Sequence, residues 1–303
     1  MSTPDYDIAV FGTNEAPTIA QCLMAIDRAV SGRSARIAVL LNGTTDNSLE
    51  IIRSTRIENA GLTVYLFQDA DKANAINWFI YELRVKAGTY FCIDAYTRIG
   101  PGALSALERA LREDTNALIA SAVPTNGRSA TATRESTLRG GRVSGQLYAM
   151  KPVFLDRLVA AGYRLPLGIY RGDPLLGSMA AHDLDAIGEK WDSRRIIGVA
   201  EATFEISPLS PFRWRDIVRQ YKREIRQARG ALENEAIKSI IYTKGYAALP
   251  ADANNMISEW LRSHRIRPAS IRQAYFMRLA RRRLDAPARE ASRGIPQMLL
   301  ESR

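Results

Sequence analysis

The sequence predicts an α/β fold in which a mainly parallel sheet is covered by helices on both faces, followed by a basic helical region. Short apolar runs alternate with amphipathic helical patterns over roughly the first 125 residues, and the pattern after residue 212 is helical and charged. The chain has 303 residues, of which 46% are hydrophobic, so it can bury a large core. We therefore expect two units, residues 1–210 and residues 211–303.

Five apolar runs have the length and composition of largely buried strands. These runs are residues 8–11, 37–41, 62–67, 90–93 and 118–123. Between them, apolar residues recur every three or four positions, as Ile19, Leu23 and Ile26 do, which indicates amphipathic helices. Strands that alternate with helices favour a sheet covered on both faces, and such sheets bind ligands beyond the carboxyl ends of their strands.

The remaining segments follow from composition and helical pattern. Residues 124–146 are rich in Gly, Ser, Thr and Arg, and we expect a mobile surface loop there. A strand and a helix then resume, and "YRGDPLLGSMA" indicates a turn that enters another helix. From Phe212 onward the pattern is helical, with breaks near Pro250 and Pro268.

Composition limits the class of protein. Cys22 and Cys92 lie in apolar patterns without CxxC spacing, which favours buried, reduced thiols over a disulfide or a zinc site. No uninterrupted run of about 18 apolar residues occurs, and the first residues lack the features of a secretory signal. We expect a cytoplasmic protein.

The net charge of +10 is concentrated in the C-terminal region. Residues 211–303 contain 20 lysines and arginines against 9 aspartates and glutamates, whereas residues 1–210 contain 22 and 23. This asymmetry predicts an anionic partner. In "IRQAYFMRLARRRL" an apolar stripe with basic residues elsewhere is typical of a helix lying peripherally on an anionic membrane, or of one whose stripe packs on the protein. No motif of a nucleic-acid reader accompanies it, so we do not expect nucleic acid as a partner.

Polar side chains follow four of the predicted strands at their carboxyl ends. They are Thr13, Asn14, Glu15, Asn42, Asp46, Lys72 and Asp94. Taken singly, Thr13 or Asn14 and Asp46 could cap helices, and Lys72 could be a solvated side chain. Their convergence at one edge of a sheet indicates a binding site.

Four stretches together resemble the successive motifs of the inverting family 2 glycosyltransferases of the GT-A fold. They are "NEAPTIAQCLMAI", "NGTTDNSLEII", "KANAINWFIYELRVKAGTYFCIDAYTRIGPGAL" and "YRGD", and the resemblance spans residues 6–206. Enzymes of this family move a sugar from a nucleotide diphosphate donor to a hydroxyl acceptor. The resemblance implies a Rossmann-like GT-A domain with that activity.

Carried over position by position, the resemblance implies a general base and a nucleotide-sugar site. Asp173 takes the place of the base, although its position before Pro174 fits a helix N-cap equally well. Arg171, Gln220 and Arg223 are assigned to the diphosphate or the acceptor. The residues assigned to the nucleotide sugar are Thr13, Glu15, Asn42, Asp46, Lys72, Asp94, Ala95, Tyr96 and Arg98.

Tyr96 breaks the metal-binding motif of the family. The pattern at residues 94–96 would be Asp-Ala-Asp, whose last carboxylate binds Mg²⁺ or Mn²⁺, but this chain has Asp-Ala-Tyr. A neutral phenol is a poor replacement, so the remaining candidate ligands of a divalent metal are Asp94 and His182, and a lone histidine is more often a packed or surface residue. The leaving diphosphate must be stabilised by positive charge, and without a metal ion cationic side chains such as Lys72 would supply it.

These observations predict an inverting glycosyltransferase that uses a nucleotide sugar, a UDP-sugar by the resemblance. Its acceptor would be a saccharide or a lipid-linked hydroxyl compound, Asp173 would take the acceptor's proton, and cations would hold the leaving phosphates. The alternative is a non-catalytic relative that keeps the fold and acts as a scaffold or regulatory protein. Tyr96 favours this alternative, whereas Asp94 and Asp173 argue against it.

Overall fold

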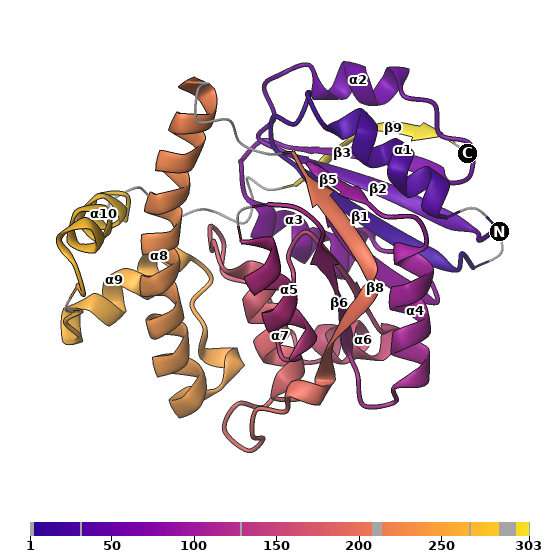
Figure 1. Cartoon of the computed structure of the whole chain (residues 1–303). Helices are drawn as coiled ribbons and strands as arrows, with labels where there is room; N and C mark the ends of the chain where they lie inside the picture. The colour runs from indigo at the N-terminus through magenta and orange to yellow at the C-terminus, as the bar shows by residue number, and fades with distance from the viewer. Residues whose placement is uncertain are drawn as a thin grey trace.

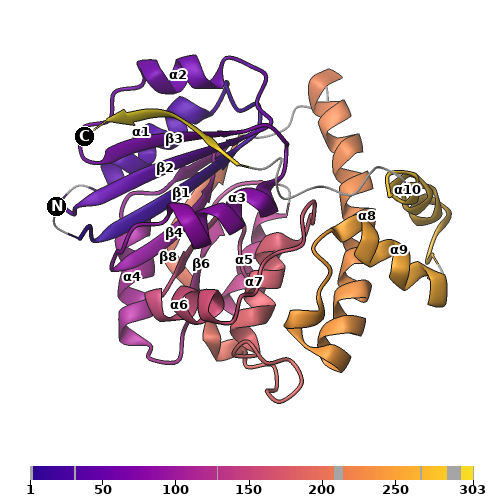
Figure 2. The ribbon, with the colours of Figure 1, turned by 180° about the vertical axis from the view of Figure 1, so that it is seen from behind.

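The structure, a computed structural model, is built on one nine-stranded sheet with the strand order β5-β8-β6-β7-β4-β1-β2-β3-β9. It describes residues 3–30, 32–127, 129–207, 214–266, 268–284 and 295–302, with the side chains of 214–216 excepted. Helices cover both faces of the sheet, and the helices of the C-terminal region lie to one side (Figures 1 and 2).

The first half of the sheet is parallel and contains four of the predicted strands. These are β3 (Gly61–Phe67), β2 (Ala35–Asn42), β1 (Tyr6–Gly12) and β4 (Thr89–Asp94). The second half is mixed, because β7 runs antiparallel between β4 and β6, and β5 runs antiparallel to β8. Its strands are β5 (Thr97–Ile99), β6 (Ile119–Pro124), β7 (Leu147–Met150) and β8 (Ile196–Ile206).

Two hydrophobic cores lie on the two faces of this sheet. One face is covered by α1 (Ile19–Ala29), α2 (Ser48–Ser54) and α4 (Ala103–Glu113), and all three were predicted from their apolar spacing. The other face is covered by α3, α6, α7 and part of the C-terminal region. Their bounds are α3 (Lys72–Trp78), which continues as a π-helical turn η1 (Phe79–Leu83), α6 (Pro152–Ala160) and α7 (Gly172–Ala181).

The prediction of a mobile loop over residues 124–146 was wrong, because this segment contains helix α5 (Ala130–Leu138). Its sequence is rich in threonine and has no clear apolar stripe, so helical periodicity gave no signal. Tertiary packing holds it instead: Thr137 is fully buried. A Cβ at Gly198 of β8 would lie 2.3 Å from the carbonyl oxygen of Thr137, so the glycine permits the close approach of α5.

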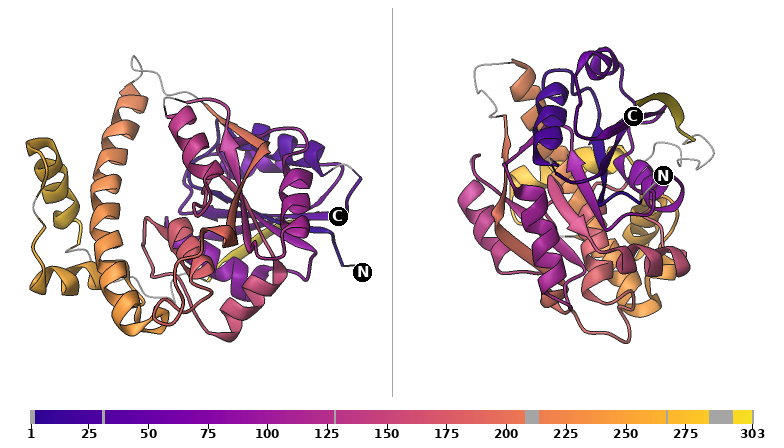
Figure 3. Two further views of the ribbon diagram at one scale, coloured as in Figure 1. Left: turned by 60° about the horizontal axis from the view of Figure 1, so that its bottom comes forward. Right: turned by 90° about the vertical axis from the view of Figure 1, so that its right-hand side faces the viewer.

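The C-terminal region forms the predicted helices and one unpredicted strand. The helices are α8 (Trp214–Lys244), α9 (Ala253–Ser263) and α10 (Ile271–Arg282), with a short 3₁₀ turn η3 (Tyr246–Ala248) after α8. Another 3₁₀ turn, η2 (Ser193–Arg195), precedes β8. Figure 3 shows α8 alongside the sheet domain, with α9 and α10 outside it. The strand β9 (Gln297–Ser302) returns to the sheet and pairs antiparallel with β3.

Residues of the C-terminal helices pack into the hydrophobic core on one face of the sheet. Leu232 and Ile237 of α8 and Met256 of α9 are buried in the same cluster as Phe11 of β1 and Leu175 of α7. Across the described residues, no helix combines the length and apolarity needed to cross a bilayer. Both cysteines are buried and unpaired, as predicted.

Candidate active site

Three charged side chains meet at the carboxyl edge of the sheet. Lys72 opens α3, Asp94 ends β4, and Asp173 lies in the first turn of α7. Lys72 Nζ lies 2.7 Å from Asp94 Oδ1 and 2.9 Å from Asp173 Oδ2, so one ammonium group bridges both carboxylates. The strand-end argument placed Lys72 and Asp94 at this edge, and the resemblance added Asp173.

Asp173 is held by two further groups that the sequence did not reveal. The hydroxyl of Tyr148 on β7 donates a hydrogen bond to Asp173 Oδ1 at 3.0 Å. A Cβ at Gly145 would lie 2.5 Å from Asp173 Oδ2, so a larger residue here would require the carboxylate to shift. The carbonyl oxygen of Gly145 also accepts from Lys72 Nζ at 3.3 Å. Asp173 is therefore fixed in position and does not merely cap a helix.

Burial and charge act in opposite directions on this cluster. Burial alone would lower the pKa of Lys72, but the carboxylates of Asp173 and Asp94 outweigh burial and raise that pKa well above its ordinary value. Burial also raises the pKa of Asp94, which is only 7% exposed, and Lys72 opposes this rise. Lys72 therefore remains an ammonium ion and supplies the local positive charge.

Tyr96 forms a hydrogen bond with the other carboxylate oxygen of Asp94. Its hydroxyl donates to Asp94 Oδ2 at 2.7 Å and accepts from Gln146 Nε2 at 3.3 Å. Burial and the nearby Asp94 raise the pKa of Tyr96, so the phenol stays protonated and remains a donor. The hydrogen bond from Tyr96 therefore stabilises the negative charge of Asp94, which a bound metal ion would otherwise stabilise.

Asp94 is the acid at which the resemblance implies a divalent cation. Both carboxylate oxygens are engaged, and within the described ranges no three His, Cys, Asp or Glu side chains cluster as metal ligands would. His182 is not brought to Asp94: its Nδ1 lies 2.9 Å from the hydroxyl of Tyr246 and 3.0 Å from the carbonyl oxygen of Ser178. Its ring also packs edge-on against Trp191. We therefore assign it a packing role.

The predicted residues of the first two strand ends lie around one pair of loops. Glu15 Oε2 accepts from the Thr18 hydroxyl at 3.0 Å. Asp46 accepts from the Ala16 N–H and from Ser48, so its contacts are those of a loop cap. Thr13 is exposed.

Asn42 differs from these residues because it is buried and one polar atom of its side chain has no hydrogen-bond partner. Its amide nitrogen donates to the carbonyl oxygen of Gly12 at 3.5 Å, while its Oδ1 has no hydrogen-bond partner. Leaving a buried acceptor unpaired costs about 1–3 kcal/mol. A ligand donor at this position would remove that cost.

The side chains of Ala95 and Arg98 contact other parts of the protein. Ala95 is fully buried, and its Cβ would be 2.9 Å from a Cβ at Gly12, so its side chain packs inward. Arg98 forms an ion pair with Glu205 on β8. Tyr96 and Arg98 nevertheless line a common pocket of about 240 Å³ at the carboxyl edge.

Helix α8, which carries the predicted residues Gln220 and Arg223, reaches the site through Arg219, a residue that the sequence did not single out. Arg219 lies 3.8 Å from Glu15 Oε1, and its guanidinium lies 5.7 Å from the centre of the Tyr96 ring. Of the predicted pair, Gln220 donates to Glu224 at 3.2 Å and Arg223 is exposed. Their assignment to the diphosphate or the acceptor stays a prediction.

A buried ion pair on α8 holds the loop that leads to Asp173. Glu233 is fully buried, and its carboxylate accepts from the backbone N–H groups of Tyr170 and Arg171 at 3.0 Å. Arg229 pairs with Glu233 at 2.9 Å and donates to the carbonyl oxygen of Gly168 at 3.0 Å. The C-terminal region thereby positions the start of α7.

No protein-family model matches the sequence, and no curated protein sequence matches it. Solved structures do match its fold. The mannosyltransferase PcManGT from Pyrobaculum calidifontis, in complex with GDP-Man and Mn²⁺, is similar with a TM-score of 0.58 and 17% identity, over 92% of this chain and 74% of that one. TarS 1–349 of S. aureus with UDP-GlcNAc is similar with a TM-score of 0.56 and 12% identity, over 93% and 76%.

A third similar structure is glucosyl-3-phosphoglycerate synthase from Mycobacterium tuberculosis in complex with Mn²⁺, UDP-glucose and phosphoglyceric acid. Its TM-score is 0.52 at 15% identity, over 76% of this chain and 78% of that one. At such identities the likeness establishes the architecture. The mixed sheet covered on both faces, with the helical C-terminal part beside it, is the GT-A fold of these glycosyltransferases.

Proposed function

We propose that this protein is an inverting glycosyltransferase that uses a nucleotide-sugar donor and Asp173 as its general base. The observation that carries the proposal is the bridge from Lys72 to Asp94 and Asp173 at the carboxyl edge of the sheet. One ammonium group and two carboxylates thus lie together where α/β sheets bind ligands, which supports these roles. The GT-A fold of the similar structures supports this assignment.

In the proposed reaction the acceptor hydroxyl attacks the anomeric carbon from the side opposite the diphosphate. The new C–O bond forms as the bond from that carbon to the phosphate oxygen breaks, and the hydroxyl proton passes to Asp173. Lys72 is placed to exchange its contact with Asp173 for a phosphate oxygen, because both carboxylates share its single ammonium group. That exchange would stabilise the leaving group and free the base.

The nucleoside of the donor is proposed to be uridine. UDP-sugars are bound in two of the similar structures, and GDP-Man in the third. The unpaired Asn42 Oδ1 supports a nucleotide at this position, because an N–H of the base can donate to it. A saccharide or lipid-linked alcohol is the proposed acceptor.

A donor panel tests the proposal. Purified protein is incubated with UDP-, GDP-, CDP- and dTDP-sugars, and nucleotide release is measured with Mg²⁺, with Mn²⁺ and without metal. Release from one donor supports the enzyme. If no donor is consumed but a nucleotide still raises the melting temperature, the alternative of a non-catalytic scaffold or regulatory protein gains support.

We expect activity to persist at least partly in EDTA. Lys72 already supplies a cation at Asp94, and Tyr96 takes the place of the second carboxylate ligand. Nucleotide release with and without EDTA is the measurement, and Tyr96→Asp is the informative variant, because a gain of metal dependence would show that the geometry still accommodates an ion. Complete loss in EDTA that Mn²⁺ reverses in the wild type would contradict the prediction.

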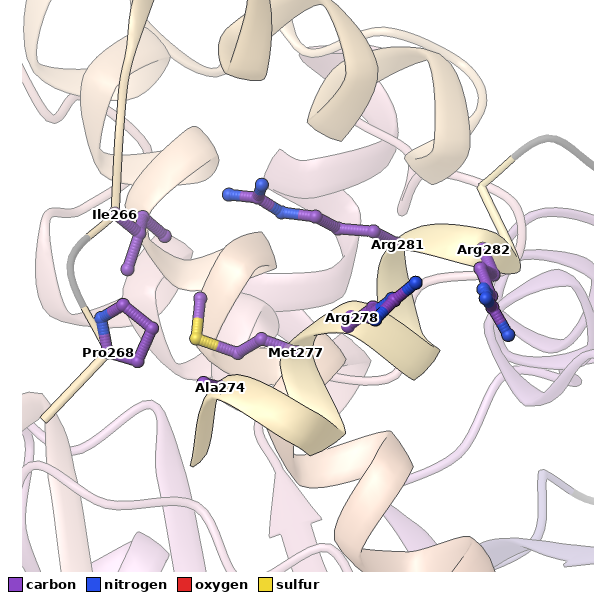
Figure 4. Close-up of a pocket in the computed structure, with 7 residues that line it drawn as sticks. All are labelled: Ile266, Pro268, Ala274, Met277, Arg278, Arg281 and Arg282. Carbon is purple, nitrogen blue, oxygen red and sulfur yellow. The ribbon is translucent and has the colours of Figure 1, made fainter. Parts of the chain in front are cut away.

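The C-terminal helices are proposed to bind an anionic membrane surface. On α10, Met277 and Ala280 are buried, whereas Ile271 and Tyr275 are 91% and 51% exposed. A pocket of about 510 Å³ lies next to this helix. Figure 4 shows the arginines that line it. Its lining comprises Ile266, Pro268, Ala274, Met277, Arg278, Arg281 and Arg282. Exposed apolar groups beside basic ones suit such a surface.

Sedimentation with liposomes checks the membrane proposal. We expect binding to vesicles that contain anionic lipid, little binding to neutral vesicles, and loss of binding as salt rises, because the attraction is screened. The variant Ile271→Ser with Tyr275→Ser should weaken binding further. Binding that ignores both lipid charge and salt would exclude the electrostatic attraction.

A further inference from the structure

Two arginines converge on the exposed ring of Tyr170, just before α7. The guanidinium carbon of Arg171 lies 5.8 Å from the ring centre, and that of Arg226 on α8 lies 5.9 Å from it. The ring is 38% exposed, so the group faces solvent. Guanidinium groups favour the face of an aromatic ring, which holds both charges at one place.

Among the described residues, neither arginine pairs with a carboxylate. Over the part of the chain that the structure describes, no carboxylate oxygen lies within 4.0 Å of the guanidinium of Arg171 or Arg226. By contrast, Arg219 and Arg229 on the same helix each pair with a glutamate. Both guanidinium groups lie within 6 Å of the same ring centre, and an anion that contacted both would neutralise their charge.

The side chain of Arg171 is held in place before any ligand binds. A Cβ at Gly230 would lie 2.5 Å from Arg171 Nε, so the arginine lies directly across the backbone of α8. This Nε is buried and has no hydrogen-bond partner. Glu233 fixes the backbone N–H of the same residue. A preorganised guanidinium loses little freedom when it binds an anion.

The position of this pair relative to Asp173 suits the acceptor. Tyr170 precedes the proposed base by three residues, a span of at most about 10 Å. The donor side of the site lies at Tyr96, where Arg219 of α8 is found. Arg226 lies seven residues further along α8, or about 10 Å along its axis. The two arginines therefore lie beside Tyr170 at the start of α7, the helix that carries the proposed base, and Arg226 lies farther along α8 than Arg219.

We propose that Arg171 and Arg226 bind a phosphate group of the acceptor. This inference rests on the proposed function, since it names the substrate class of the same site. Two positive charges match the charge of a phosphate dianion, and guanidinium groups donate paired hydrogen bonds to its oxygens. The acceptor hydroxyl would then lie within reach of Asp173 while its phosphate is held at Tyr170.

Titration calorimetry with inorganic phosphate as the probe tests this site. We expect wild-type protein to bind phosphate more tightly than acetate. Arg226→Gln should weaken phosphate binding about tenfold, the effect of losing one charge-assisted contact. The control is Lys244→Gln, which removes one charge from an exposed position about 27 Å away on α8 and should bind like the wild type.

Nucleotide binding in the same variants separates this proposal from the proposed function. Arg226→Gln should leave the affinity for nucleotide diphosphates unchanged. An equal loss of nucleotide and phosphate affinity would assign the arginine to the donor and overturn the proposal, as would phosphate binding that Arg226→Gln does not change. If the wild type binds and consumes no nucleotide sugar, the proposed function fails whatever the phosphate result.

Discussion

Asp173→Asn is expected to lower the rate of sugar transfer by about 10³-fold while nucleotide binding persists. An amide has nearly the shape of the carboxylate and can still accept the hydrogen bond from Tyr148, but it cannot take the acceptor's proton. General-base catalysis contributes about 10²–10⁴-fold to enzyme rates. Product formation at saturating donor measures the rate, and the nucleotide-induced rise in melting temperature measures binding.

Asp156→Asn is the matched control for this change. Asp156 lies on α6, its side chain is exposed, and its ion pair with Arg84 is a surface contact worth about 0–1 kcal/mol. We expect near wild-type transfer from this variant. If Asp173→Asn transferred sugar as fast as Asp156→Asn, Asp173 would not be the base.

Glu233→Ala is expected to lower the free energy of unfolding by about 3–5 kcal/mol. The substitution leaves the buried charge of Arg229 without its partner. Removing one partner of a buried ion pair typically costs about 3–5 kcal/mol of stability. It also removes the acceptor for the N–H groups of Tyr170 and Arg171. Urea unfolding monitored by circular dichroism measures the change.

Two further variants separate charge from hydrogen bonding at this position. Glu233→Gln keeps a carbonyl acceptor for the loop, so it should lose less stability than alanine. Glu235→Ala removes an exposed glutamate of α8 whose partner is Lys238, and it should cost no more than about 0.5 kcal/mol. Equal urea midpoints for Glu233→Ala and Glu235→Ala would contradict a holding role for the buried pair.

Much of the fold was predictable because its first half obeys local rules. The five apolar runs became β1, β2, β3, β4 and β6, and the predicted amphipathic helices formed between them. Helix α5 was missed because packing on β8, and not its own pattern, holds it. Strand β9 was missed because its pairing with β3 joins residues more than 200 positions apart, which no local pattern encodes.

The candidate site likewise contains residues that the local sequence predicts and residues that only contacts between distant segments reveal. Lys72 and Asp94 were found because strand ends converge, and Asp173 because of its motif. Gly145, Tyr148 and Glu233 act through contacts between distant parts of the chain, so spacing gave no sign of them. His182 was a candidate ligand on residue type alone, and its aromatic surroundings became visible only in three dimensions.

The pairing of β9 with β3 has a consequence for synthesis on the ribosome. Residues 61–67 emerge early, yet the partner for one side of their strand is translated more than 200 residues later. During that interval the nascent sheet displays an open row of amide and carbonyl groups that another chain could pair with. Protection of that edge by a chaperone would therefore matter most before residues 297–302 leave the exit tunnel.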